Sequence, residues 1–122
     1  MKVKSMVRYY SKVILLLLSW GYSYVSKATI TTGTISPTSY CSGSPVSVPY
    51  TIGTTFSAGN IFIAQLSDAS GSFANPVVIG TLASTAAGTI NAVIPHNTPT
   101  GTGYRIRVVS TSPVVTGTDN GV

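Results

Sequence analysis

The sequence predicts an all-β protein, a β-sandwich of six or seven short strands preceded by a helical leader. Three observations predict this fold class. The chain of 122 residues contains 12 Gly and 7 Pro, and in a helix interior a glycine costs about 1 kcal/mol and a proline about 3 kcal/mol. The segments between these residues alternate apolar and polar side chains, which is typical of half-buried strands. The turn signals also recur at intervals expected of a sandwich.

The leader is predicted to be a secretory signal peptide over residues 1–28. Residues 1–12 carry four cationic side chains and no acid, and the apolar run VILLLL follows at 13–18, which is the order found in signal peptides. Small residues at Ser26 and Ala28 place cleavage after Ala28. The alternative is a membrane anchor, but the apolar stretch is shorter than the roughly 20 residues that a spanning helix needs. We expect an exported protein, secreted or on the cell surface, that contacts the membrane only through this leader.

The basic character of the chain belongs to the leader. The formal net charge is +5, yet five of the seven cations lie in residues 1–28. After the leader, Arg105 and Arg107 are balanced by Asp68 and Asp119. Nucleic-acid binding depends on Lys and Arg that neutralise phosphates, so a neutral domain is not expected to bind nucleic acid.

The strands of the domain are expected from residue 29 onward. The first lies near 29–35 and the second at 46–52, where every second residue is apolar. Pro49 lies within the second strand and has no N–H for a sheet ladder, which favours an edge or irregular strand. The third strand, NIFIAQLS at 60–67, is apolar on both sides. Either side of this strand therefore fits the core.

Three further strands follow. Residues 77–82 and 89–94 are joined by a turn of small residues at 83–88. The next strand begins at Tyr104, directly after the Gly- and Pro-containing turn at 98–103. Tyr104 is expected to tie the strand to the loop through its hydroxyl, as in a tyrosine corner.

The C-terminal residues 116–121, TGTDNG, form a turn signal. In a sandwich this turn leads into a further strand, but the sequence ends at Val122. We therefore expect a domain over residues 29–122 that lacks its last strand. The open sheet edge would pair with another chain and cause self-association.

Three stretches resemble a known family. They are CSGSPVSVPY at 41–50, GNIFIAQLSDASGSF at 59–73 and GYRIRV at 103–108. Together they resemble the immunoglobulin-like β-sandwich repeat modules of secreted and surface proteins of Bacteroidota, of the type associated with type IX secretion. The resemblance covers residues 36–121 and implies an immunoglobulin-like fold and an extracellular location. Such modules space or attach adhesive, glycan-binding or hydrolase domains.

The ionisable residues after the leader are too few for the usual catalytic sites, so we expect no enzyme, cofactor or metal. His96 is the one histidine of the chain, whereas catalytic and metal sites need partner groups. Asp68 is expected to be a turn residue that bonds its own backbone, with a weak calcium site as the alternative. Asp119 is likewise expected in a turn. Cys41 is expected to be buried as a small apolar residue, the alternative being a nucleophile paired with His96.

The candidate binding face consists of Arg105, Arg107 and Tyr50. The two arginines lie on one side of their strand, and Tyr50, Tyr40 or Phe56 would add an aromatic surface for glycans or a protein partner. The alternative is that the arginines are the solvated side of a strand.

The predicted function is that of a non-enzymatic secreted or cell-surface structural and adhesion module, whose partners are glycans or other surface proteins. Two alternatives remain open. One is a carbohydrate-binding accessory domain, for which the candidate aromatic residues are Tyr40, Tyr50, Phe56 and Phe73. The other is the N-terminal fragment of a larger secreted hydrolase.

Overall fold

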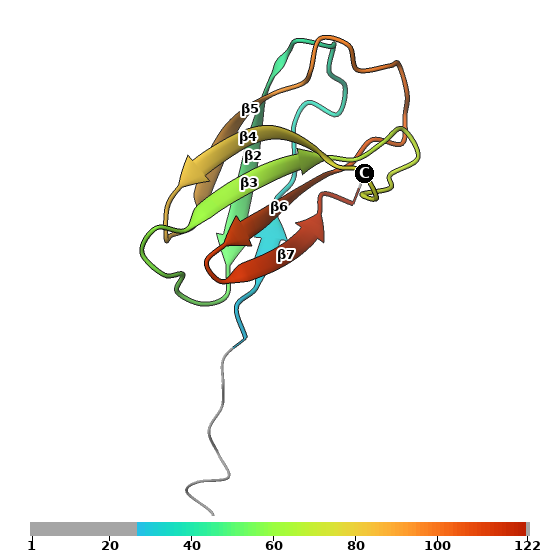
Figure 1. Ribbon diagram of the computed structural model, residues 1–122. Coiled ribbons are helices and arrows are strands. Elements are labelled where there is room, and N and C mark those ends of the chain that lie inside the picture. Colours follow the sequence, from blue (N-terminus) through green and yellow to red (C-terminus); the bar gives the residue numbers. More distant parts are fainter. Residues whose placement is uncertain (1–26, 122) are drawn as a thin grey trace, which may run out of the picture.

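The computed structural model describes residues 27–121, and this part of the chain is all-β (Figure 1). It contains seven strands and no helix, so none of its elements is a helix long and apolar enough to cross a membrane. The strands are β1 (Ile30–Thr32), β2 (Pro45–Ile52), β3 (Ile61–Leu66), β4 (Val77–Ala83), β5 (Gly88–Val93), β6 (Ile106–Thr111) and β7 (Val114–Asp119). The predicted signal peptide, residues 1–28, lies outside the described residues except for Lys27 and Ala28.

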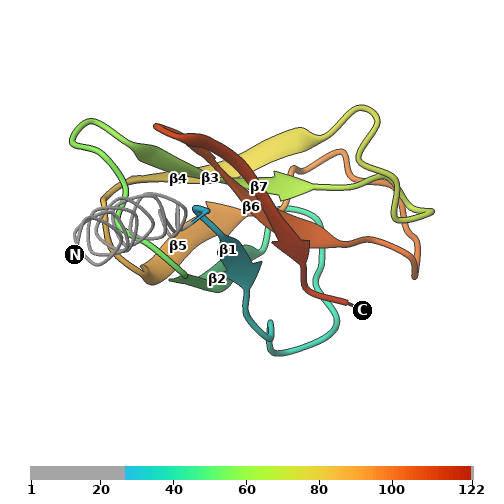
Figure 2. The same cartoon turned by 90° about the horizontal axis from the view of Figure 1, so that it is seen from below.

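The seven strands form one mixed sheet in the order β4-β3-β6-β7-β1-β2-β5. The strands β4, β3, β6 and β7 form one antiparallel group, and β1, β2 and β5 form another. A short parallel pairing between β1 and β7 joins the groups at Thr31 and Thr118. Figure 2 shows the two groups on opposite sides of the molecule. The two ends of the sheet also approach each other, since a Cβ added at Gly80 in β4 would lie 2.9 Å from the Ala92 Cβ in β5.

The core lies between the two groups and follows from the alternation of the strands. In β2 the buried residues alternate with more exposed ones, and β6 shows the same pattern. In β3 the structure selects one of the two predicted faces, because Phe62, Ala64 and Leu66 are buried. The Phe62 ring lies 4.5 Å from the Tyr50 ring of β2 and 5.0 Å from the Phe56 ring, measured between centroids. These contacts connect the two groups, and burying a side chain of this size contributes about 1.5–3 kcal/mol.

Pro49 is not on an edge strand, because β2 pairs with both β1 and β5. The Pro49 carbonyl accepts a hydrogen bond of 2.8 Å from the Gly33 amide. In an extended strand the amide and carbonyl of one residue point to the same side. The missing N–H of Pro49 therefore faces Gly33, directly after β1, where the ladder between β1 and β2 ends, and this explains how a central strand accommodates proline.

The predicted C-terminal turn is wrong over residues 116–119, which belong to β7. The chain turns earlier, at residues 112–113, where the Ser110 hydroxyl donates to the Pro113 carbonyl and accepts from the Val115 amide. The strand then lies between β6 and β1 instead of at an edge. Gly117 is required there, because a Cβ would lie 2.5 Å from the Val108 carbonyl oxygen. The sheet edges of the described domain are β4 and β5.

A buried asparagine joins two turns at one end of the sheet. Asn60 is 1% exposed. Its side-chain amide donates to the Ser84 carbonyl at 3.0 Å. Its Oδ1 accepts from the amides of Thr111 and Ser112, at 3.2 and 2.9 Å. The turn after β4 is thereby held to the turn after β6, a link that the sequence analysis missed.

Candidate binding site

Arg105 and Arg107 lie near each other, and both already have partners in the fold. The Arg105 Nη1 lies 3.3 Å from the Asp119 Oδ2 in an exposed ion pair, which contributes little to stability because water screens it. The Arg107 Nε donates to the Gln65 Oε1 at 2.9 Å. Its guanidinium also lies 4.3 Å from the centre of the Phe73 ring, in a cation–π contact. These contacts are those of a strand surface whose charges are satisfied locally.

Tyr50 does not join the arginines in a surface, because its side chain is 2% exposed. Its position in β2 alternates with outward-facing residues, so the ring points into the core. The hydroxyl donates to the Ala86 carbonyl at 2.8 Å, and burial raises the pKa of this phenol. Phe56 is also buried, at 6% exposure. The predicted binding face of Arg105, Arg107 and Tyr50 is therefore wrong for Tyr50, which is buried. Tyr50 and Phe56 are likewise removed from the predicted set of exposed aromatic residues.

Asp68 organises the turn after β3, as predicted. Its Oδ1 accepts from the Ser70 hydroxyl at 2.7 Å and from the amides of Ser70 and Ser72, both at 2.9 Å. These hydrogen bonds, that of the Ser70 hydroxyl foremost, lower the pKa of the carboxyl group. Asp119 is the last residue of β7 instead of a turn residue, although its Oδ1 accepts from the Gly121 amide just beyond the strand.

His96 and Cys41 are both exposed. His96 lies in the loop between β5 and β6. The predicted burial of Cys41 is wrong. Cys41 follows Tyr40 in the loop between β1 and β2, where it precedes the turn closed by the Ser44 amide and the Cys41 carbonyl. The described residues contain no group of three or more His, Cys, Asp or Glu side chains placed to hold a metal ion.

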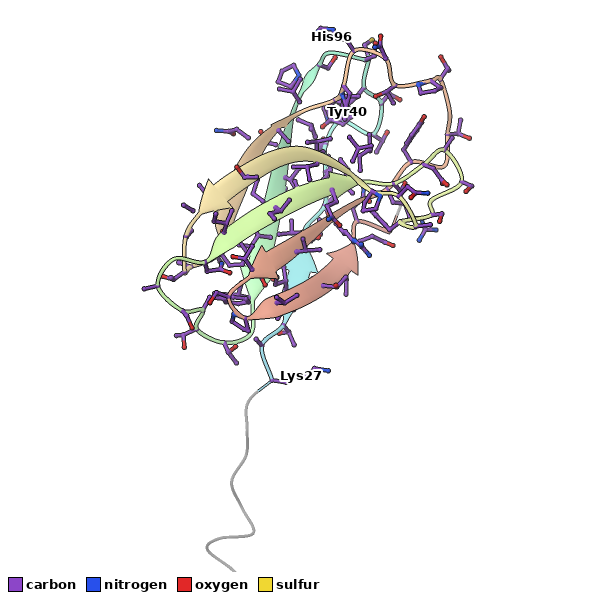
Figure 3. All side chains as sticks on the ribbon, in the orientation of Figure 1. Lys27, Tyr40 and His96 are labelled. Carbon is purple, nitrogen blue, oxygen red and sulfur yellow. The ribbon has the colours of Figure 1, made fainter. Side chains whose placement is uncertain are left out.

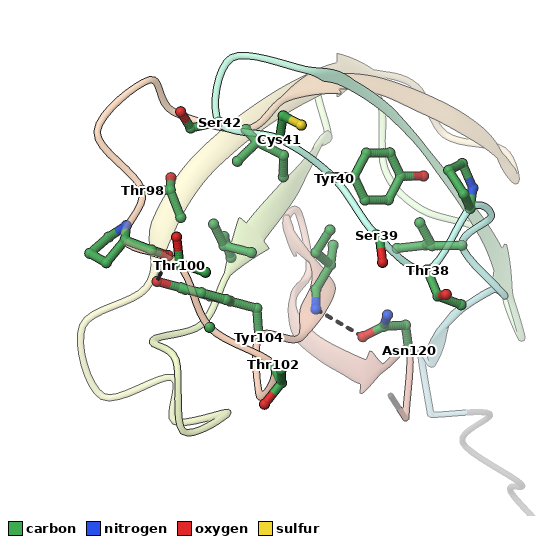
Figure 4. A pocket seen from close by; sticks show the side chains of 17 residues that line it. Thr38, Ser39, Tyr40, Cys41, Ser42, Thr98, Thr100, Thr102, Tyr104 and Asn120 are labelled. Atoms are coloured by element: carbon green, nitrogen blue, oxygen red, sulfur yellow. Dashed lines mark hydrogen bonds between the residues drawn. The ribbon is translucent and has the colours of Figure 1, made fainter.

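A pocket of about 590 Å³ opens at the loop end of the domain (Figure 4). One wall is the loop between β1 and β2, which contributes Tyr40, and the other is the loop between β5 and β6, which contributes Tyr104. Asn120, just after β7, completes the lining. Figure 3 places Tyr40 and His96 at the end of the molecule opposite Lys27. The pocket therefore lies far from the point where the described chain begins.

The walls of the pocket are fixed by hydrogen bonds. The Tyr104 hydroxyl donates to the Pro99 carbonyl at 2.9 Å, as predicted, but Tyr104 lies in the loop two residues before β6 and not in the strand. The Asn120 Oδ1 accepts from the Ile106 amide at 2.9 Å (Figure 4). On the other wall the Gly43 amide donates to the Ile94 carbonyl at 2.7 Å. The loop between β1 and β2 is thus bound to the residue after β5, and the loop between β5 and β6 is closed by a bond within itself.

The lining of the pocket combines apolar, aromatic and hydroxyl groups. Its base is apolar and consists of the buried residues Ile35, Leu66, Ile94 and Ile106. Eight of its 17 described residues carry a hydroxyl, and none carries a charged side chain. The hydroxyl-bearing residues are Thr38, Ser39, Tyr40, Ser42, Thr98, Thr100, Thr102 and Tyr104. Concave sites of a few hundred Å³ with such a mixture are typical of small-molecule binding.

Sequence reasoning identified Tyr40 and Tyr104 separately but not the pocket that they share. The available signal was the pair of loops rich in Ser and Thr, SPTSYCS at 36–42 and TPTGTGY at 98–104. In each loop a tyrosine follows a run of small hydroxyl residues. The chain matches no family model, and neither a curated protein nor a solved structure is significantly similar to it.

Proposed function

We propose that this chain is an exported, non-enzymatic adhesion and attachment module with an immunoglobulin-like fold. The leader at residues 1–28 supports export, since its charged and apolar regions follow the order of a signal peptide. After the leader the formal charges cancel. The observation that best supports a binding role is the loop-end pocket, whose described lining residues carry no charge.

The immunoglobulin-like part of the proposal is supported by the strand arrangement. Two antiparallel groups, one of four strands and one of three, meet across a common core. The hydroxyl of Tyr104 bonds to the loop before its strand, as in the tyrosine corners of such domains. A fold of this kind presents its loops at the two ends of the sheets, and loops on a rigid scaffold commonly carry binding sites.

The pocket shifts the proposed contact surface away from the arginine side of the sheet. Arg105 and Arg107 have partners in Asp119, Gln65 and Phe73, so binding there would exchange existing contacts for new ones. Hydroxyl groups at the pocket rim, such as those of Thr100 and Thr102, belong to exposed residues. The pocket is therefore the better supported attachment site, and it supports the carbohydrate-binding alternative.

Export is tested by producing the full chain in a bacterial host and sequencing the N-terminus of the protein recovered outside the cytoplasm. The expected N-terminus is Thr29. As a control, replacing two residues of the run at 15–18 by arginine should keep the chain inside the cell, because the apolar region is then interrupted. Recovery of the unmodified chain, beginning at Met1, only from the cytoplasm would contradict the proposal.

A further inference from the structure

The base and the rim of the loop-end pocket differ in polarity, so they favour different chemical groups of a ligand. The base is apolar, with Leu66 and Ile106 only 4% and 5% exposed. The rim is polar, and Thr38, Ser39, Thr100 and Thr102 are exposed there. A ligand that fills the pocket must therefore cover apolar surface and also replace the water bonded to the rim hydroxyls.

The charge of the lining narrows the class of ligand. None of the described lining residues carries a charge. An anionic ligand would lose its hydration without gaining an ionic partner, which is unfavourable in a partly buried site. Arg105 directly follows the lining residue Tyr104 in the sequence, and its guanidinium forms an ion pair with Asp119. The pocket therefore favours a neutral ligand.

The two tyrosine rings add flat apolar surfaces to opposite walls. Tyr40 is half-buried and packs against the core. Tyr104 is likewise half-buried, and its hydroxyl is held by the Pro99 carbonyl, so its ring has a fixed orientation. Figure 4 shows the two rings on different sides of the opening. An aromatic ring offers large contact area at low conformational cost.

We propose that this pocket binds a neutral saccharide, with the ring of Tyr40 against an apolar face of the sugar and the hydroxyls of Thr100 and Thr102 bonded to its hydroxyl groups. A sugar ring carries C–H groups on its faces and hydroxyls at its edge, which matches the apolar and polar parts of the lining. Ser and Thr hydroxyls both donate and accept, and so pair with sugar hydroxyls in either sense. This inference deepens the proposed attachment function by naming the ligand class.

A purely apolar ligand matches the pocket less well. It would cover the base, but it would strip water from the rim hydroxyls without offering them a hydrogen bond, at a cost of about 1–3 kcal/mol for each group left unpaired. The Asn120 amide adds a further polar group, and its Oδ1 is already occupied by the Ile106 amide. The nitrogen of this amide is left as the donor toward the pocket.

The inference is tested by affinity electrophoresis of the purified chain from Thr29 onward, which lacks the five cations of the leader, in alkaline native gels that contain a neutral polysaccharide. The probes are xyloglucan, laminarin, galactomannan and dextran, with alginate as the anionic comparison. We expect retardation by at least one neutral probe and none by alginate. Tyr40→Ala should weaken the affinity for that probe at least tenfold, and Thr100→Val combined with Thr102→Val should weaken it several-fold.

The matched control is Thr85→Val, which removes an exposed hydroxyl from the turn between β4 and β5, outside the pocket lining. It should leave retardation unchanged. If Tyr40→Ala does not fold, as judged by circular dichroism, the double threonine variant decides, since valine keeps the shape of threonine. Retardation by alginate alone, retardation that these variants do not reduce, or no retardation by any neutral probe would overturn the inference. None of these results affects export, which is measured separately through the N-terminus.

Discussion

Replacing Asn60 by alanine removes a side chain that holds two turns together. The Asn60 amide donates to the Ser84 carbonyl, and its oxygen accepts from the amides of Thr111 and Ser112. Asn60 is 1% exposed, so water does not compete with these hydrogen bonds in the native fold. Asn60→Ala therefore leaves one carbonyl and two amides without their partner and opens space beneath the turns.

The expected loss of stability follows from these three hydrogen bonds. A net contribution of about 1 kcal/mol for each gives a decrease of about 3 kcal/mol in the free energy of unfolding. Ser112 is half-buried and Thr111 exposed, so water can reach part of the freed backbone, and the full penalty for unpaired groups does not apply. Domains of ordinary stability unfold with about 5–15 kcal/mol, so the variant should still fold.

Urea unfolding followed by circular dichroism measures this change. With a denaturant slope of about 1–3 kcal/mol per molar urea, the midpoint should fall by roughly 1–3 M. The matched control is Asn97→Ala, at an exposed loop position, and should change stability by less than about 0.5 kcal/mol. If Asn60→Ala is no less stable than Asn97→Ala, the three hydrogen bonds contribute nothing net and the reasoning fails.

Three other predictions concern single positions. Gly103→Ala places a Cβ against the Ala69 carbonyl oxygen and should cost about 1–3 kcal/mol; an unchanged melting temperature would contradict this. The hydrogen bonds that lower the pKa of Asp68 below 3.8 stabilise the fold above that pH, and this stabilisation is lost as the pH falls through the folded-state pKa. The difference in unfolding midpoint between wild type and Asp68→Asn should thus become smaller as the pH falls from 6 toward 2, and a difference that does not change with pH would refute this. The exposed Cys41 thiol should react with a thiol reagent as fast in the native protein as in urea, whereas burial predicts protection.

The strands with strong apolar alternation were predictable from the sequence, because one buried face repeats with period two. The segment containing Val48 and the segment containing Val108 follow this rule, and both residues are fully buried. The same alternation also indicated that Tyr50 is buried, which the predicted binding face overlooked. In β3, apolar residues occupy both sides, so only packing against the other strand group selects Phe62 for the core, where its ring contacts the rings of Tyr50 and Phe56.

The last strand was not predictable in this way, since β7 contains no buried residue and includes Gly117. Its strand conformation depends on pairing with β6 on one side and with β1 on the other, and β1 is distant in the sequence. The pocket was hidden for a similar reason. The loops that contain Tyr40 and Tyr104 come together only because the sheet brings β2 and β6 to the same core. Local patterns do not contain that information.

The position of Lys27 at the opposite end from Tyr40 has a practical consequence for how the domain is attached to a surface (Figure 3). Coupling through the amino-terminal side directs the pocket outward into solution. Coupling through the thiol of Cys41, which lines the pocket, directs the same pocket toward the support. Two sensor chips that carry equal amounts of protein should therefore differ in capacity, and orientation alone would decide how many molecules remain accessible.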